Sequence, residues 1–325
     1  MLSPLAANAK LQTPAGRYTG VQPKTRVVLI VLLVATLAWP ATAVAEDPPF
    51  VGWTALLPGL SIPYDVDSPD DCVAGRIQCV DKTVREMTRR FDPLASSCDH
   101  NAIFALTYLR VTEEYRRTVA GPFFDDTPFV NHEDTIFARY YFEAYDAWAA
   151  GDAGDVPPAW RLAFDAARAH RVSASGDLLL GINAHVQRDL PFVLYSIGLV
   201  KPDGTSRKLD HDRVNQILNR VTDEVIGEIA RRFDPTIDDG NLPTTLDDFA
   251  LFQVVVAWRE AAWRNAELLA AAPTAAARDN IASQIEANAA IAARAIILLT
   301  QYPPLSRGST DRDSYCAIHH DDPYP

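Results

Sequence analysis

Two ionisable residues, His185 and Asp189, lie four positions apart within the apolar segment 178–193. Residues at this spacing share one face of an α-helix, so both side chains point the same way from a segment that should be buried. A buried imidazole and carboxylate must bind each other, coordinate a metal or belong to a site. The pair therefore predicts a polar pocket centred on these residues, although it specifies no reaction.

One chemistry open to such a pair is metal binding, because an imidazole and a carboxylate on one helix face can reach a single zinc ion. Further ligands would come from other helices, and the candidates are His100, His132, Glu113, Asp134, Glu143 and His211. Zinc lowers the pKa of a bound water, and Asp134 or Glu113 would complete the metal shell or act as a catalytic base. Each candidate also has a structural interpretation, since acids favour the first turn of a helix.

The alternative for the central pair is a satisfied polar network in the core, in which Asp189 orients His185 and Arg188 neutralises Asp189. Asn183 is a further polar member of the same segment. Pro191 favours a pocket instead, because a proline inside a helix displaces the carbonyl group four residues earlier and leaves it without a donor. Both interpretations stay open at this point.

Aromatic residues recur on three predicted helices: Tyr108, Tyr140, Tyr141, Tyr145, Trp258 and Trp263. Rings at helical spacing are typical of a core, but together with a charged side chain they can also line a pocket for a small molecule. We expect the pocket around the central pair to include Asn183, Arg188, Tyr108, Tyr141, Arg259 and Trp263.

Helical periodicity recurs along residues 79–302, and no segment shows the sustained alternation of strands. Capping residues or prolines indicate helix starts at Asn131, Pro157-Pro158, Ser175, Asp210 and Thr245. Segment 178–193 is apolar on nearly all sides, so other helices must surround it. The sequence therefore predicts an all-α fold, a single globular bundle of seven or eight helices around a central buried helix.

The N-terminal region is typical of a secretory signal. Lys24 and Arg26 precede an apolar run at 27–39, and Ala43-Val44-Ala45 then supplies a small-residue cleavage pattern. The run is shorter than the ~20 residues of a membrane span, and a retained anchor is the alternative. We expect a signal peptide (1–45), an extended arm (46–78), a helical domain (79–302) and a C-terminal tail (303–325). The localisation would be secreted or cell envelope, without stable membrane insertion after cleavage.

The formal net charge is −12, and without residues 1–45 it becomes 26 − 42 = −16. An acidic chain disfavours nucleic acid as a partner, because phosphate binding needs Lys and Arg to replace counterions. The sequence also lacks a P-loop, a Gly-x-Ser-x-Gly elbow and a His-Glu-x-x-His motif. These absences disfavour nucleotide-binding proteins, lipase-like hydrolases and standard zinc proteases.

An even number of cysteines in an exported protein predicts disulfides. The four are Cys72, Cys79, Cys98 and Cys316, and three pairings are possible. We favour Cys72–Cys79 as a local clip and Cys98–Cys316 as a tie for the C-terminal tail.

The run Gly181-Ile-Asn-Ala-His-Val-Gln-Arg-Asp-Leu190 resembles the core motif of a bacterial, all-helical family of unknown function. Four further segments occur in the matching order: Tyr108-Leu-Arg-Val-Thr-Glu113, Asp134-Thr-Ile-Phe-Ala-Arg-Tyr-Tyr-Phe142, Pro157-Pro-Ala-Trp160 and Asp212-Arg-Val-Asn215. The resemblance covers most of residues 80–300. It implies a helical fold and assigns no reaction.

His185-x-x-x-Asp189-Leu-Pro is also similar to part of the zinc-ligand motif of bacterial zinc-dependent phospholipases C and single-strand nucleases. In those enzymes a further histidine follows the proline, whereas Phe192, Val193 and Leu194 follow here. This resemblance implies a reduced site with one or two metal ions.

Two functions follow as expectations. The first is a non-catalytic ligand-binding or cell-envelope protein that holds a small molecule in the pocket around His185 and Asp189. The alternative is a metal-dependent hydrolase of phosphoester type, in which these two residues bind a divalent metal such as zinc. The sequence does not indicate an oligomeric state.

Overall fold

The computed structural model describes residues 64–237 and 244–324, with the helical backbone alone for residues 244–250. The described chain is all-α, as predicted, and its β-structure is limited to two isolated bridges. The α-helices are α3 (Ile77–Ser96), α4 (Ala102–Thr118), α5 (Thr127–Ala150), α6 (Pro158–Arg168), α7 (Ala174–Ile182), α8 (Leu190–Ile197), α9 (Lys208–Arg232), α10 (Thr244–Ala271), α11 (Ala275–Thr300) and α12 (Gly308–His319). Short helices of other types are η2 (Ala153–Asp155), η3 (Asn183–Asp189) and η4 (Pro235–Ile237).

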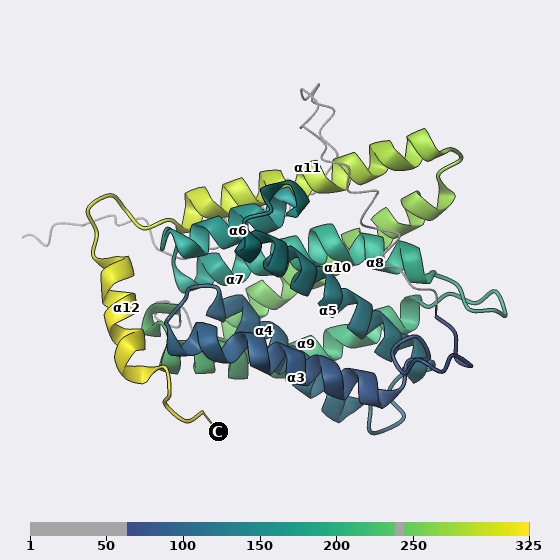
Figure 1. Ribbon diagram of the computed structural model, residues 1–325, viewed down its shortest axis with the longest axis horizontal. Coiled ribbons are helices and arrows are strands. Elements are labelled where there is room, and N and C mark those ends of the chain that lie inside the picture. Colours follow the sequence, from purple (N-terminus) through teal and green to yellow (C-terminus); the bar gives the residue numbers. More distant parts are fainter. Residues whose placement is uncertain (1–63, 238–243, 325) are drawn as a thin grey trace, which may run out of the picture.

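Helices α7, η3 and α8 follow one another without a break and form a central rod (Figure 1). The rod packs against α4, α5, α6, α10 and α11, because nearly every side of it is apolar and must be covered. If the rod is counted as one helix and the short helices η2 and η4 are left out, the described residues form nine helices. The prediction of a bundle around a central buried helix is confirmed, and α12 in the predicted tail accounts for a helix beyond the expected number.

Side-chain caps start three of the described helices, α5, α7 and α11, and two of these caps differ from the predicted positions. The Asp126 carboxylate accepts a hydrogen bond from the backbone N–H of Phe129 at 3.2 Å and starts α5. Asn131, the predicted cap, is buried inside that helix. Ser173, rather than Ser175, caps α7. In both cases a second capping residue lies close by in the sequence, so composition alone placed the start too late.

Both predicted disulfides are confirmed: Cys72 is bonded to Cys79 and Cys98 to Cys316. The second bond joins α12 to the loop before α4. The predicted signal peptide and most of the predicted arm lie outside the described residues.

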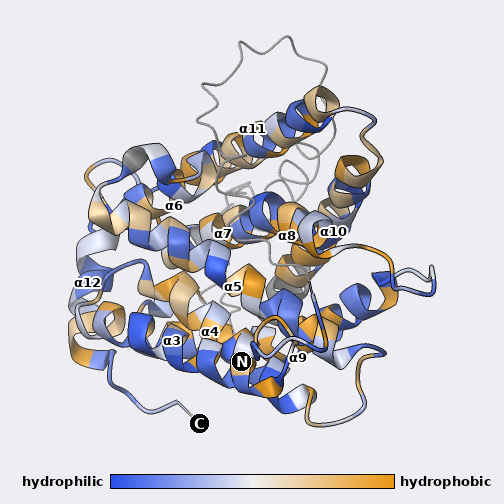
Figure 2. Cartoon of the chain, turned by 45° about the vertical axis from the view of Figure 1, so that its right-hand side comes forward, coloured by the Kyte–Doolittle hydropathy of each residue, from blue (hydrophilic) through white to orange (hydrophobic). Residues whose placement is uncertain are grey.

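Outer helices such as α3 carry both hydrophilic and hydrophobic residues, as expected of helices with one buried face (Figure 2). Helix α11 is the one described helix long and apolar enough to cross a membrane. It packs against α6, α7, η3 and α10, and half of its apolar window is buried. A helix buried in a protein core can be as long and as apolar as α11, so this property alone does not indicate a membrane span.

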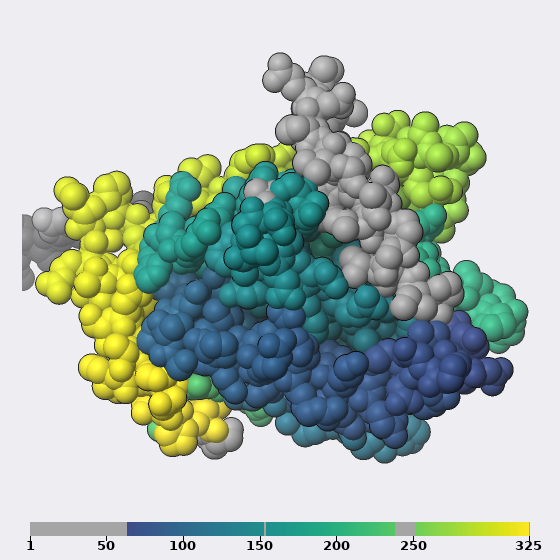
Figure 3. All heavy atoms as spheres, in the orientation of Figure 1, coloured from purple at the N-terminus to yellow at the C-terminus, as the bar shows by residue number. Residues whose placement is uncertain are grey.

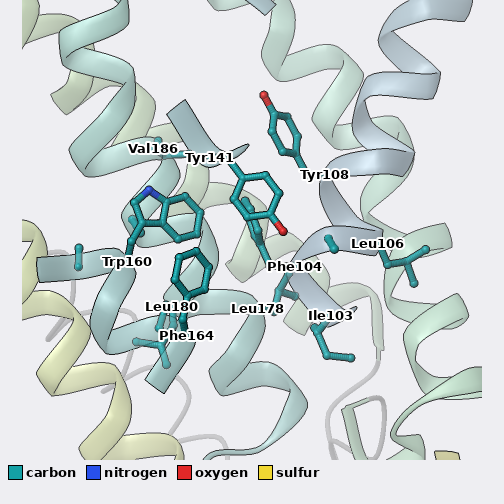
Figure 4. Close-up of a cluster of buried hydrophobic side chains, with 14 of the residues drawn as sticks. Ile103, Phe104, Leu106, Tyr108, Tyr141, Trp160, Phe164, Leu178, Leu180 and Val186 are labelled. Atoms are coloured by element: carbon teal, nitrogen blue, oxygen red, sulfur yellow. The ribbon is translucent and has the colours of Figure 1, made fainter. Parts of the chain in front are cut away.

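Large aromatic side chains fill the space beside the rod (Figure 4). Trp160 stacks on Phe164 at 5.0 Å between ring centroids, and Phe104 meets Trp160 edge to face at 5.3 Å. Gly181 lets the rod approach this cluster, because a Cβ atom at that position would lie 2.3 Å from the Phe104 ring. The close approach fixes the part of the rod that carries His185.

Candidate functional site

A cavity of about 140 Å³ lies between the rod and helices α4, α5, α9 and α10. Most of its wall is apolar, and these side chains include Phe104, Val111, Phe137, Leu178, Ile182, Val214, Ile217, Leu218, Val221, Val225, Leu251, Phe252 and Val255. The ionisable side chains on its wall are Tyr108, Tyr115, Glu133, Asp134, His185 and Arg259. The cavity is therefore amphipathic.

The His185 imidazole is buried and held by aromatic rings. It stacks on Phe137 at 3.4 Å between ring centroids and lies 4.3 Å from the ring of Tyr108. Its Nδ1 atom is 3.6 Å from Oδ2 of Asp189, and its Nε2 atom has no hydrogen-bond partner among the described residues. Burial lowers the pKa of His185, and the nearby Asp189 carboxylate offsets this shift only in part. The ring is therefore neutral near pH 7.

The shared helix face of His185 and Asp189 is confirmed, but Asp189 is engaged by other donors. Its Oδ2 atom accepts a hydrogen bond from the Trp160 indole N–H at 2.8 Å, and its Oδ1 atom accepts one from Arg188 at 2.9 Å. Arg188 also donates to Glu286 at 2.6 Å. Asp189 thus belongs to a buried polar network behind the cavity wall, with Arg188 as its cation as the core-network interpretation proposed, but with Trp160 rather than His185 as the other donor.

The backbone around this pair is π-helical over η3. The N–H of Leu190 bonds to the carbonyl of His185, one residue further back than in an α-helix. Pro191 follows directly and cannot donate to Gln187, so the wider turn is how the rod accommodates the proline. Single turns of π-helix are frequent at functional sites because they displace side chains relative to an α-helix.

Two adjacent carboxyl groups on α5 lie on the cavity wall, and both resist ionisation. Burial raises the pKa of Asp134 to about 8, with a smaller contribution from the Glu133 charge. Burial also raises the pKa of Glu133 to about 7, although Arg259 and Arg207 act in the opposite direction. Asp134 is therefore mainly a neutral carboxylic acid at pH 7, able to donate a hydrogen bond.

Apart from Nδ1 of His185, which faces Asp189, three buried polar atoms of the cavity-lining residues have no hydrogen-bond partner among the described residues: the Tyr108 hydroxyl, Oδ2 of Asp134 and Nε2 of His185. Figure 4 shows the Tyr108 hydroxyl pointing away from the Trp160 and Phe164 rings. Buried polar groups are nearly always hydrogen-bonded in folded proteins, so three without partners on one cavity mark a binding position.

Arg259 brings a positive charge to the same wall. Its guanidinium donates to Oδ1 of Asn215 at 2.8 Å and to the backbone carbonyl of His211 at 2.7 Å. It makes no ion pair within 4.0 Å to a carboxylate of the described residues. Burial lowers the pKa of Arg259 to about 10, so the group still carries its charge at pH 7.

The structure brings four predicted site residues to the cavity: Tyr108, Asp134, His185 and Arg259. Asn183, Arg188 and Asp189 are buried in the rod and do not line it. Tyr141 lies in the aromatic core, and Trp263 donates its indole N–H to Glu267 at 2.8 Å.

Glu113, proposed as a base, does not line the cavity and instead binds Arg110 at 2.8 Å. Glu133 was missed. The predicted helix start at Asn131 would place it in a first turn, where acids are common, but α5 begins at Thr127, so Glu133 lies beyond that turn and on the cavity wall.

Other predicted metal ligands are also engaged elsewhere. Nδ1 of His132 lies 2.7 Å from the Cys72 carbonyl, and Nε2 of His211 lies 3.3 Å from the Arg259 carbonyl. Within the described residues, one group of three or more side chains could hold a metal ion, and it consists of His100, His170 and Asp313. Metal binding by His185 and Asp189 stays a prediction.

Comparison with known proteins adds a family but no activity. No curated protein and no solved structure matches the chain. A family model described as a family of unknown function (DUF5995) matches residues 80–299, which include the rod and the six ionisable residues of the cavity. The chain therefore belongs to the DUF5995 family of unknown function.

Proposed function

We propose that this protein is a non-catalytic binding protein that holds one small, largely apolar molecule in the cavity beside the rod. The observation that carries the proposal is the set of three unpartnered polar atoms on an otherwise apolar wall. Ligand pockets commonly combine apolar walls with a few polar groups that fix the ligand's orientation. The ligand would supply the missing hydrogen bonds at its polar end.

The size of the cavity limits the ligand. Its volume is about 140 Å³. An apolar cavity of about 150 Å³ in another protein takes up benzene. The proposed ligand is therefore a single six-membered ring or a short chain with one hydrogen-bonding group.

The protonation states of Asp134 and His185 limit the ligand further. Asp134 is mainly protonated at pH 7 and His185 is neutral, so both can exchange hydrogen bonds with an uncharged group. A hydroxyl or carbonyl oxygen can accept from the Tyr108 or Asp134 hydroxyl groups. We therefore assign the ligand to the class of uncharged alcohols, phenols and ketones.

The proposed setting is outside the cytoplasm, secreted or at the cell envelope. Two disulfides are consistent with an oxidising compartment. The hydrolase alternative receives less support, because both oxygens of Asp189 already accept hydrogen bonds, from Trp160 and Arg188, and this residue does not line the cavity.

Phenol and toluene test this proposal because they have nearly the same shape and differ in one hydroxyl group. NMR titration should show that both bind and that phenol binds more tightly. Tyr108→Phe should weaken phenol binding by roughly 2- to 10-fold, the value of one hydrogen bond, and leave toluene binding unchanged. Tyr141→Phe is the matched control, since Tyr141 is a buried tyrosine outside the cavity wall. Equal loss in both variants, or no binding of either compound, would contradict the proposal.

A further inference from the structure

A second group of polar side chains lies at the end of the molecule where α12 packs. His100 precedes α4, His170 follows α6 and Asp313 belongs to α12. One carboxylate bridges the two imidazoles: Oδ1 of Asp313 is 2.9 Å from Nε2 of His100, and Oδ2 is 2.9 Å from Nδ1 of His170. The two rings stack at 4.1 Å between centroids. One possible ligand atom from each residue lies within 4.8 Å of the others.

The buried His100 also faces a second carboxylate on its other side. Its Nδ1 atom is 3.5 Å from Oδ2 of Asp177, and this nitrogen makes no hydrogen bond among the described residues. A neutral imidazole has only one N–H, so it cannot donate to Asp313 and Asp177 at once. In the neutral ring, one of these two contacts is therefore left unsatisfied.

A metal ion on Nε2 removes this conflict. The ring proton would then sit on Nδ1 and point at Asp177, the arrangement in which a second carboxylate orients a metal-binding histidine. Asp177 is itself held by Arg312, which donates to its Oδ2 atom at 2.6 Å. Two imidazole nitrogens and a carboxylate oxygen are a donor set that suits zinc and neighbouring transition metals.

We infer that His100, His170 and Asp313 bind one divalent transition metal ion of the zinc class, which fastens α12 to the ends of α4 and α6. The side chains of His170 and Asp313 are 42% and 37% exposed, so solvent can reach the ion and supply a further ligand. His170 also adopts a left-handed backbone conformation, with φ of 48°, which is uncommon for a residue other than glycine.

The metal site would supplement the Cys98–Cys316 disulfide, which also joins α12 to the segment before α4. Figure 3 shows the C-terminal segment, in yellow, covering that end of the molecule next to the blue residues of the α3–α4 region. Asp313 lies beyond the residues that the family model matches, so the site depends on a segment outside the family region. This inference is independent of the proposed ligand cavity.

The test uses the full chain after treatment with EDTA. Calorimetric titration with Zn²⁺ should show one ion bound per chain, and Co²⁺ should give the visible absorption bands of a site with nitrogen ligands. His170→Asn removes one ligand while keeping a residue that tolerates positive φ. It should weaken Zn²⁺ binding by roughly 100-fold or more, because even outer-shell changes weaken metal binding about 10- to 100-fold.

His319→Asn is the matched control. His319 is a partly exposed histidine on α12, the helix that carries Asp313, but it pairs with Asp322 and not with the proposed metal ligands. It should bind Zn²⁺ and Co²⁺ as the wild type does. Absence of stoichiometric binding, or equal weakening in both variants, would overturn the inference. Circular dichroism of the metal-free variants checks that both are folded.

Discussion

Replacing Asp134 by Asn should change how the stability of the protein depends on pH. The carboxyl pKa is 3.8 in an unperturbed residue and about 8 in the folded protein. Because the folded state holds this proton more tightly, its stabilising contribution is complete below pH ~4 and is lost as the pH rises toward ~8. Asparagine has nearly the same shape but no proton to lose, so the variant does not experience this loss.

The magnitude follows from the two pKa values. Between pH 5 and pH 7.5 the unfolded carboxyl is almost fully ionised while the folded one stays mainly protonated. One pKa unit corresponds to ~1.4 kcal/mol, so wild type should lose about 3 kcal/mol relative to Asp134→Asn over this interval. Other titrating groups are present in both proteins, and their contributions largely cancel in the difference.

Urea unfolding at both pH values measures this difference directly. Asp223→Asn, on the exposed side of α9, is the control and should show no comparable change. A constant difference between wild type and Asp134→Asn from pH 5 to 7.5 would refute the argument, because it would mean that Asp134 is not desolvated on the cavity wall.

Two further perturbations test the interior and the disulfides. Arg188→Met leaves the Asp189 and Glu286 carboxylates buried without their cation and should reduce the free energy of unfolding by roughly 3–5 kcal/mol. The control Arg264→Met removes an exposed ion pair and should change the free energy of unfolding by about 1 kcal/mol or less. Equal effects of the two substitutions in urea unfolding would contradict the assignment of a buried network. Removing Cys98–Cys316 by a double Ser substitution should destabilise the protein by about 5 kcal/mol, against about 2 kcal/mol for Cys72–Cys79, because the two bonds span 218 and 7 residues. Unfolding of the two double variants in urea compares them, and a larger effect of the shorter loop would be inconsistent with this reasoning.

Local sequence signals were sufficient for the helical class and for the central rod. The apolar residues around His185 occupy nearly every side of a helix, and only a buried position accommodates such a segment. Pro158 opens α6 as expected, since proline fits the first turn of a helix. Of the three possible cysteine pairings, the favoured one is confirmed, in which the two cysteines seven positions apart form a local bond and Cys98 pairs with Cys316 of the C-terminal segment.

Long-range pairing could not be predicted in this way. Arg188 and Glu286 are 98 positions apart, and Asp313 is 213 positions from His100. Helical periodicity indicates which face of a helix is buried, but it does not say which other helix covers that face. The proposed metal group therefore became visible only in the folded chain, although His100 had been noted separately as a candidate ligand.

The predicted part of the site likewise combines a local feature that the sequence spacing predicts with a long-range contact that it does not. The spacing of His185 and Asp189 fixed their common face, and their contact at 3.6 Å follows from it. Which of the two faces the cavity depends on Trp160, whose indole N–H engages Asp189 from α6. Asp210, predicted as a cap, instead accepts from the backbone N–H groups of Asp125 and Asp126 before α5.

The position of bound phenol tests the proposed function most directly. A crystal structure with phenol should place the ring among the apolar residues of α4, α9 and α10. Its oxygen should lie about 3 Å from the Tyr108 hydroxyl, Oδ2 of Asp134 or Nε2 of His185. A cavity that holds only ordered water at saturating phenol, or a ring bound elsewhere on the molecule, would contradict the account.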